Sequence, residues 1–158
     1  MLTVKPFRQS PAHCGPACLK MVLDYFGLEK SEAELAKLCR TSMKTGTKSD
    51  AILAAAKQLG FDGFLRDGAT LADIRTFVHK KKVPVMVNWF STDYGHYSVV
   101  VDIDAKHISL QDPELNDIRV MDLKIFQQVW FDYFGMGYPR DNNDFVVRRM
   151  IVIEPKKH

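Results

Sequence analysis

The chain has little of what marks several large classes of protein. Its 158 residues include only 3 cysteines, and 22 basic against 19 acidic side chains leave a formal net charge of +3. Three thiols without a secretory signal argue against a disulfide scaffold and favour reduced cysteines. A charge excess this small, without a basic stripe interleaved with aromatic residues, argues against nucleic-acid binding.

Long apolar runs are also missing. Residues 1–8 hold no apolar stretch of signal-peptide length, and the runs elsewhere fall far short of a membrane span. The sequence therefore predicts a cytoplasmic protein without membrane insertion. A length of 158 residues, 46% of them hydrophobic, fits one domain over residues 1–158 with a single core.

The apolar pattern changes near the middle of the chain. In the first half, apolar residues recur at three- and four-residue intervals beside cap or stop signals, which predicts helices. From residue 83 onward, β-branched and aromatic residues dominate, which predicts strands. Helices are expected over residues 14–26, 31–38, 49–59, 70–78 and 122–130, strands over 83–90, 96–103, 107–111, 118–121 and 145–153, and a loop over 134–144. This order favours an α+β fold, with an N-terminal helical half packed on a C-terminal antiparallel sheet.

Cys14 stands at the start of the first expected helix. Gly15 lets the backbone pass close to a neighbour, and Pro16 is favoured at the first helical position. Unpaired N–H groups and the positive end of the helix dipole stabilise a thiolate, which is the reactive form of cysteine. Without other information, a cysteine at a helix start is more often a small buried residue than a nucleophile.

A nucleophilic thiol needs a base and a group that orients this base. His96 opens one expected strand, and Asp112 follows the next. If residues 96–103 and 107–111 form a tight hairpin, the start of one strand lies opposite the end of the other. Taken singly, a strand histidine is usually structural and an aspartate before proline is an ordinary turn residue. Their combination with Cys14 favours catalysis.

Gln9 lies five residues before Cys14 and carries a side-chain amide that could complement the Cys14 backbone N–H at an oxyanion. A zinc site built from Cys14, Cys18 and Cys39 is the competing interpretation. The spacing of Cys14 and Cys18 has no matching second pair, so zinc is disfavoured, and Cys18 and Cys39 are expected in the core. His13 is adjacent to Cys14 and is a poor candidate for the base.

These residues resemble the C39 family of cysteine peptidases, papain-like domains that cut leader peptides after a double glycine and are often fused to bacteriocin-exporting ABC transporters. The resemblance covers most of the chain up to about residue 132. It is carried by Gln9, Cys14-Gly15-Pro16-Ala17-Cys18, Gly46-Thr47, Leu59-Gly60-Phe61, Pro84-Val85-Met86-Val87-Asn88-Trp89, Gly95-His96-Tyr97-Ser98-Val99-Val100-Val101, Asp112-Pro113, Phe126 and Trp130.

The resemblance implies that Cys14 is the nucleophile, His96 the general base and acid, Asp112 the orienting acid and Gln9 the oxyanion-hole donor. It also implies a peptide or protein substrate such as a double-glycine leader, and neither a metal nor an organic cofactor. The chain departs from the family pattern at His13, where an acidic residue is common, and in the spacing of Gln9, which is commonly six residues ahead.

The chain holds no membrane helix pattern and no phosphate-binding loop motif, so it is not expected to export peptides by itself. A separately encoded ABC transporter is a candidate partner. Two other functions stay open. A phytochelatin-synthase-like enzyme would pass the acyl group to an amine, and a C39-like binding module would hold a peptide without cutting it. Intact Cys14, His96 and Asp112 argue against the binding module.

Overall fold

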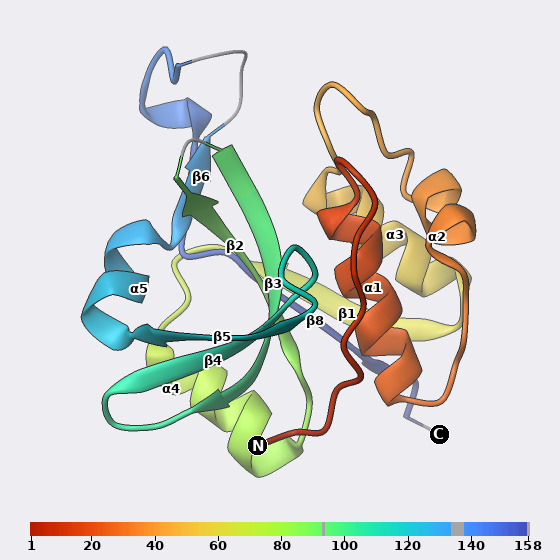
Figure 1. Ribbon diagram of the computed structural model, residues 1–158, viewed down its shortest axis with the longest axis horizontal. Helices are drawn as coiled ribbons and strands as arrows, with labels where there is room; N and C mark the ends of the chain where they lie inside the picture. Colours follow the sequence, from red (N-terminus) through yellow and green to blue (C-terminus); the bar gives the residue numbers. More distant parts are fainter. Residues whose placement is uncertain (93, 134–137, 158) are drawn as a thin grey trace.

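The computed structural model describes residues 1–92, 94–133 and 138–157. Its centre is a six-stranded antiparallel sheet with the strand order β1-β8-β2-β3-β4-β5, and β6 and β7 form a separate hairpin (Figure 1). The helices are α1 (Cys14–Tyr25), α2 (Glu32–Leu38), α3 (Ser49–Gln58), α4 (Leu71–Arg75), the π-helix η1 (Thr76–Lys81), α5 (Leu123–Val129) and the 3-10 helix η2 (Asn142–Asp144). The strands are β1 (Phe61–Arg66), β2 (Val85–Ser91), β3 (Tyr94–Ile103), β4 (His107–Asp112), β5 (Asp117–Asp122), β6 (Phe131–Tyr133), β7 (Phe145–Val147) and β8 (Met150–Pro155).

The caps read from the sequence are present where the helices begin. The Ser31 side chain accepts a hydrogen bond from the backbone of Glu34, and Thr70 forms a reciprocal capping box with Asp73. Each of these bonds pairs an N–H group that the first helical turn leaves free. Pro16 is the exception, because α1 begins at Cys14 and places the proline third. The proline is still tolerated there, since that position has no intrahelical acceptor for an N–H.

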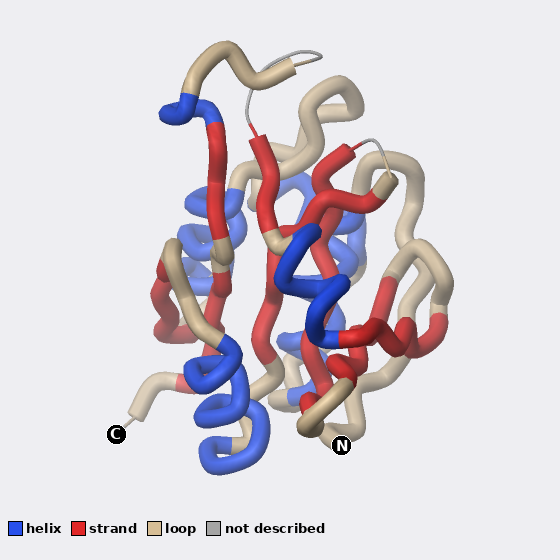
Figure 2. Tube along the Cα trace, turned by 90° about the vertical axis from the view of Figure 1, so that its left-hand side faces the viewer, coloured by secondary structure: helices blue, strands red, loops and turns tan. Residues whose placement is uncertain are grey.

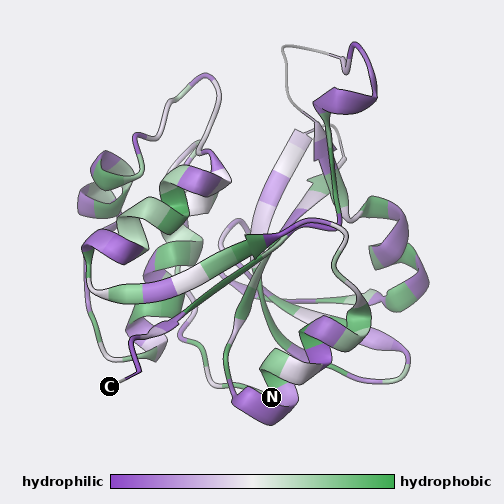
Figure 3. Cartoon of the chain, turned by 180° about the vertical axis from the view of Figure 1, so that it is seen from behind, coloured by the Kyte–Doolittle hydropathy of each residue, from purple (hydrophilic) through white to green (hydrophobic). Residues whose placement is uncertain are grey.

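Helices lie on both faces of the sheet, so the core is divided in two (Figure 2). The α1-side cluster joins α1, α2 and α3 to the sheet, and the α5-side cluster joins α4, η1 and α5 to the opposite face. In β8, Ile151 and Ile153 belong to the first cluster, whereas Met150 and Val152 belong to the second. Figure 3 shows the resulting band of hydrophobic residues along the central strands. The single core expected from the sequence is therefore two clusters separated by the sheet.

A β-bulge interrupts the alternation of β3. Val99 packs in the α1-side cluster and Val100 in the α5-side cluster, but Ile103 joins Val100 instead of Val99. The register with β4 shifts between Val100 and Asp102, and an inserted residue of this kind moves the following side chains to the other face.

Three expectations about the strands were wrong. The helical half also contains β1, which pairs with β8 from the end of the chain. The single strand expected over 145–153 is divided into β7 and β8, which belong to different sheets. The hairpin partner β6 was not expected at all. Of the loop expected over 134–144, residues 134–137 lie outside the described part, and η2 occupies 142–144.

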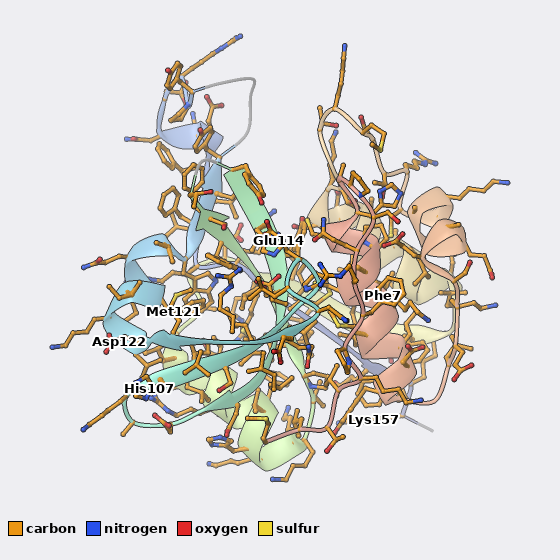
Figure 4. All side chains as sticks on the ribbon, viewed as in Figure 1. Phe7, His107, Glu114, Met121, Asp122 and Lys157 are labelled. Atoms are coloured by element: carbon orange, nitrogen blue, oxygen red, sulfur yellow. The ribbon has the colours of Figure 1, made fainter. Side chains whose placement is uncertain are left out.

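The N-terminal segment before α1 connects the two halves. The Leu2 N–H donates to the Val101 carbonyl at 2.9 Å, and the Gln9 N–H donates to the Pro113 carbonyl at 2.9 Å. Phe7 lies beside α1 (Figure 4), with the Lys20 ammonium 5.5 Å from its ring centroid. The segment thus reaches α1 after passing β3 and the end of β4. None of the helices in the described ranges is long and apolar enough to cross a membrane.

Phe126 on α5 has no exposed surface, whereas the adjacent Ile125 is 50% exposed. We expect Phe126→Ala to lower the free energy of unfolding by about 3–5 kcal/mol, because it removes a large buried ring and leaves a cavity. Ile125→Ala on the same helix should cost less than about 1 kcal/mol. Urea titrations followed by circular dichroism compare the two variants, and equal losses would contradict this packing.

Candidate active site

Cys14 is the first residue of α1 and is partly exposed. The backbone next to it is closely packed, because a Cβ at Gly15 would lie 2.8 Å from the Cβ of Thr47. The close approach expected at Gly15 is therefore confirmed, and only glycine fits without movement. This contact places the loop before α3 against the start of α1.

Tyr97 on β3 holds the same region from the sheet side. Its hydroxyl donates to the Thr47 carbonyl at 3.0 Å and lies 2.7 Å from Ser49 Oγ, at the start of α3. Burial raises the pKa of the Tyr97 phenol well above its ordinary value, so the group remains a neutral donor. The start of α1 is thus connected to β3 through the Thr47 loop.

His96 and Asp112 meet as the hairpin expected from the sequence requires. The register between β3 and β4 pairs Val99 with Gln111, which brings the start of β3 beside the end of β4. His96 Nε2 lies 2.8 Å from Asp112 Oδ1, with the two side chains 1% and 0% exposed. A carboxylate can only accept, so Nε2 carries the shared proton. Nδ1 is then the ring nitrogen left for Cys14, whose thiol is close enough to raise the pKa of His96.

The pKa values describe a charged, buried pair. Burial alone would lower the pKa of His96, but the hydrogen bond to Asp112 and the nearby Cys14 thiol outweigh it and raise the pKa to about 9. Burial would raise the pKa of Asp112, yet hydrogen bonds from His96, Arg119 and the Glu114 backbone lower it to about 2. At neutral pH the arrangement therefore favours an imidazolium against a carboxylate.

Several neighbours of the pair were not identified from the sequence. The Trp89 ring meets the His96 imidazole edge-on at 5.6 Å, and the Tyr94 ring does so at 6.3 Å. The Glu114 carboxylate comes within 3.8 Å of His96 Nε2 and accepts a hydrogen bond from the Tyr94 hydroxyl. Figure 4 shows Glu114 between the sheet and α1. The two aromatic rings shield the imidazole from solvent, while the exposed Glu114 carboxylate adds negative charge beside it.

Gln9 lies close to the end of β4, because its N–H donates to the Pro113 carbonyl. Its side-chain Nε2 is 3.3 Å from the Ser10 carbonyl, and its Oε1 is buried with no hydrogen-bond partner among the residues that the structure describes. Glu32 holds this loop by accepting hydrogen bonds from both the N–H and the hydroxyl of Ser10. The Gln9 backbone is therefore held next to Asp112 through Pro113, but the side-chain donor group points to Ser10 instead of Cys14.

Cys18 and Cys39 are buried, as expected, with 0% and 1% exposure. Burial raises the pKa of both thiols, that of Cys39 to about 12, so they remain protonated and are poor metal ligands. Among the residues that the structure describes, the one group of three with ligand atoms close enough for a metal is His96, Asp112 and Glu114. The zinc site weighed for the cysteines thus has no geometric support in the described ranges. Both carboxylate oxygens of Asp112 already accept hydrogen bonds from N–H donors.

Comparison with solved structures shows the same fold. The peptidase domain of Streptococcus ComA, a bifunctional ABC transporter involved in quorum sensing, superposes with a TM-score of 0.73 and 25% identity, over 98% of this chain and 100% of that domain. A double glycine motif protease from an AMS/PCAT transporter, solved with a leader peptide, gives a TM-score of 0.74 at 18% identity, over 98% and 94% of the two chains. The papain-like α+β architecture expected from the sequence is confirmed.

The sequence comparisons agree with the fold. An uncharacterized protein of Methanothermobacter marburgensis is 33% identical over 72% of this chain and 74% of its own length. The lactococcin-G-processing and transport ATP-binding protein LagD of Lactococcus lactis is 30% identical over 72% of this chain, but only 16% of LagD is covered. The model of the peptidase C39 family matches residues 6–136. The chain therefore belongs to the peptidase C39 family.

Proposed function

We propose that the protein is a cysteine endopeptidase in which Cys14, His96 and Asp112 form a catalytic triad. The observation that carries the proposal is the buried His96 ring, which is hydrogen-bonded to Asp112 and close enough to Cys14 for that thiol to raise its pKa. Such a pair can activate a thiol as a nucleophile, because an oriented imidazolium stabilises the thiolate beside it. A binding module would not need such a pair.

The proposed reaction runs in two steps. The Cys14 thiolate attacks the carbonyl carbon of the peptide bond, and the imidazolium of His96 protonates the departing amine as the C–N bond breaks. Water then attacks the resulting thioester while His96 takes its proton, which releases the acid and restores the Cys14 thiolate beside the imidazolium. Asp112 holds the ring in position, and the Gln9 amide would turn toward the oxyanion during both steps.

For the substrate we propose a peptide with a double glycine before the cleaved bond. The double glycine motif protease supports this class, and LagD, which processes lactococcin G, supports a peptide substrate, because both are similar to this chain. We further propose that a separately encoded ABC transporter receives the product. A cytoplasmic location suits Cys14, because the thiol must stay reduced to react.

Replacing Cys14 with alanine should abolish cleavage, because the nucleophilic sulfur is lost. Wild type and variant are incubated with a diverse peptide library that contains double-glycine leaders, and mass spectrometry identifies the products and the residues beside each cut. Cys39→Ala, which removes a buried thiol at the end of α2, is the matched control and should retain cleavage. Cleavage that persists without Cys14 would contradict the proposal, and products carrying an added amine such as glutathione would indicate acyl transfer.

The rate of cleavage should give a bell-shaped pH profile. The pKa of His96 is raised to about 9, so the imidazolium is present through neutral pH and is lost as the pH rises through that value. On the acid side, activity falls because only the thiolate form of a cysteine is nucleophilic. Values of kcat/KM, obtained from initial rates between pH 4 and 10, test this expectation. A profile that only rises with pH would indicate an unactivated thiol.

Gln9→Ala should lower kcat by about 10²–10³-fold if its amide stabilises the oxyanion. Alkylation of Cys14 by iodoacetamide forms no oxyanion, so the rate of alkylation should stay unchanged. Gln127→Ala, at an exposed position of α5, controls for loss of an amide. Equal losses of cleavage and alkylation in the Gln9 variant would instead mean that Gln9 supports the thiol itself.

A further inference from the structure

Arg119 lies on β5 and is bonded to the carboxylate of Asp112. Its Nε donates to Asp112 Oδ2 at 2.7 Å, and the arginine side chain is 29% exposed. The other oxygen, Oδ1, accepts from His96 Nε2 at 2.8 Å and from the Glu114 N–H at 2.9 Å. Arg119 is therefore the partner of the one carboxylate oxygen that His96 and Glu114 do not contact.

A second contact fixes the guanidinium. The guanidinium carbon of Arg119 lies 5.4 Å from the ring centroid of Trp89, within the range of a cation–π interaction. The Trp89 indole also meets the His96 ring edge-on and donates from Nε1 to Ser98 Oγ at 3.0 Å. One indole thus packs against both the imidazole and the arginine that hold Asp112. Arg119, Asp112, His96 and Trp89 form a closed ring of contacts.

We propose that Arg119 is a positioning residue of the reaction, which fixes the plane of the Asp112 carboxylate so that Oδ1 stays directed at His96. The inference rests on the proposed function of the triad. A carboxylate held only through Oδ1 can rotate about its terminal bond, and rotation would misalign the imidazole with Cys14. A planar guanidinium bonded to Oδ2 opposes this rotation, and the compact ammonium of lysine would supply only charge.

The surroundings of Asp112 predict how its removal changes the response to pH. The titratable or charged groups beside Asp112 are His96 from β3, Arg119 and Asp117 from β5, Glu114 from the turn after β4 and Cys18 from α1. Without the arginine, burial acts on the carboxylate with less opposition, so Asp112 takes up a proton at a higher pH. A protonated Asp112 carries no charge to stabilise the imidazolium. The acid limb, which is the low-pH side of the rate profile, then moves to higher pH.

The test compares Arg119→Gln and Arg119→Lys with wild type in two assays from pH 4 to 10, namely peptide cleavage and the alkylation of Cys14 by iodoacetamide, mapped by mass spectrometry. We expect Arg119→Gln to lower kcat by about 10–100-fold, with KM unchanged and the acid limb moved to higher pH in both assays. Arg119→Lys should keep the acid limb near its wild-type position, because the positive charge remains. Its kcat should still fall, because an ammonium does not fix the plane of the Asp112 carboxylate as the guanidinium does.

Arg149→Gln is the matched control. Arg149 Nε donates to Asp67 at the same distance of 2.7 Å, and neither residue contacts the triad. This variant should lose thermal stability without a change in kcat or pH profile. Where Arg119→Gln does not fold, Arg119→Lys carries the test through its kcat.

Each remaining result has one meaning. An Arg119→Gln profile that superposes on wild type, an Arg119→Lys variant with full kcat, or an equal shift in Arg149→Gln would overturn the positioning role. If wild type shows an activated thiol but cuts no peptide, the endopeptidase proposal fails, while the alkylation profiles still decide the role of Arg119. A wild-type Cys14 that reacts as an ordinary thiol would overturn both.

Discussion

A carboxylate without exposed surface accepts a hydrogen bond from an imidazole that is also buried, and the rest of the site is arranged around this pair. Burying an ion is unfavourable unless its oxygens are paired, so Asp112 requires donors at both oxygens. His96, the Glu114 backbone and Arg119 supply them. Burial would lower the pKa of His96, but the hydrogen bond to Asp112 outweighs it, with a smaller contribution from Cys14, and the pKa rises to about 9. The proposed reactivity of Cys14 thus depends on the Asp112 carboxylate, which acts on the thiol through His96.

The residues of the pair could be predicted from the sequence because a tight hairpin is a local structure. Two strands with a short turn between them leave one register that buries both apolar faces, and this register places His96 beside Asp112. The helices of the first half were predictable for the same reason, since Ser31 and Thr70 act on N–H groups within three residues. Fold class followed from the order of these local elements.

What the sequence did not reveal depends on distant partners. β1 is a strand because β8, from the far end of the chain, pairs with it, and its own residues carry no strict alternation. Arg119 lies on the outermost strand, β5, where a charged residue ordinarily faces solvent. Only the packing of β4 and Trp89 beside it turns this arginine toward Asp112. The Gln9 amide is similar, because its direction depends on the Ser10 loop and not on its spacing from Cys14.

The register of β3 also determines how the two halves meet. Successive strand residues point to opposite faces, so His96 packs with Trp89 on one face while Tyr97 belongs to the α1-side cluster on the other. Tyr97 donates to the Thr47 carbonyl, and Thr47 packs closely against Gly15, so the start of α1 is connected to β3 through this loop. A register slip of one residue would move His96 and Tyr97 to the opposite faces of the sheet. His96 would then lose its place beside Asp112, and Tyr97 would lose its contact with the loop that packs against the start of α1. The bulge beyond Val100 leaves this stretch unaffected, because it shifts the register only after both residues have been placed.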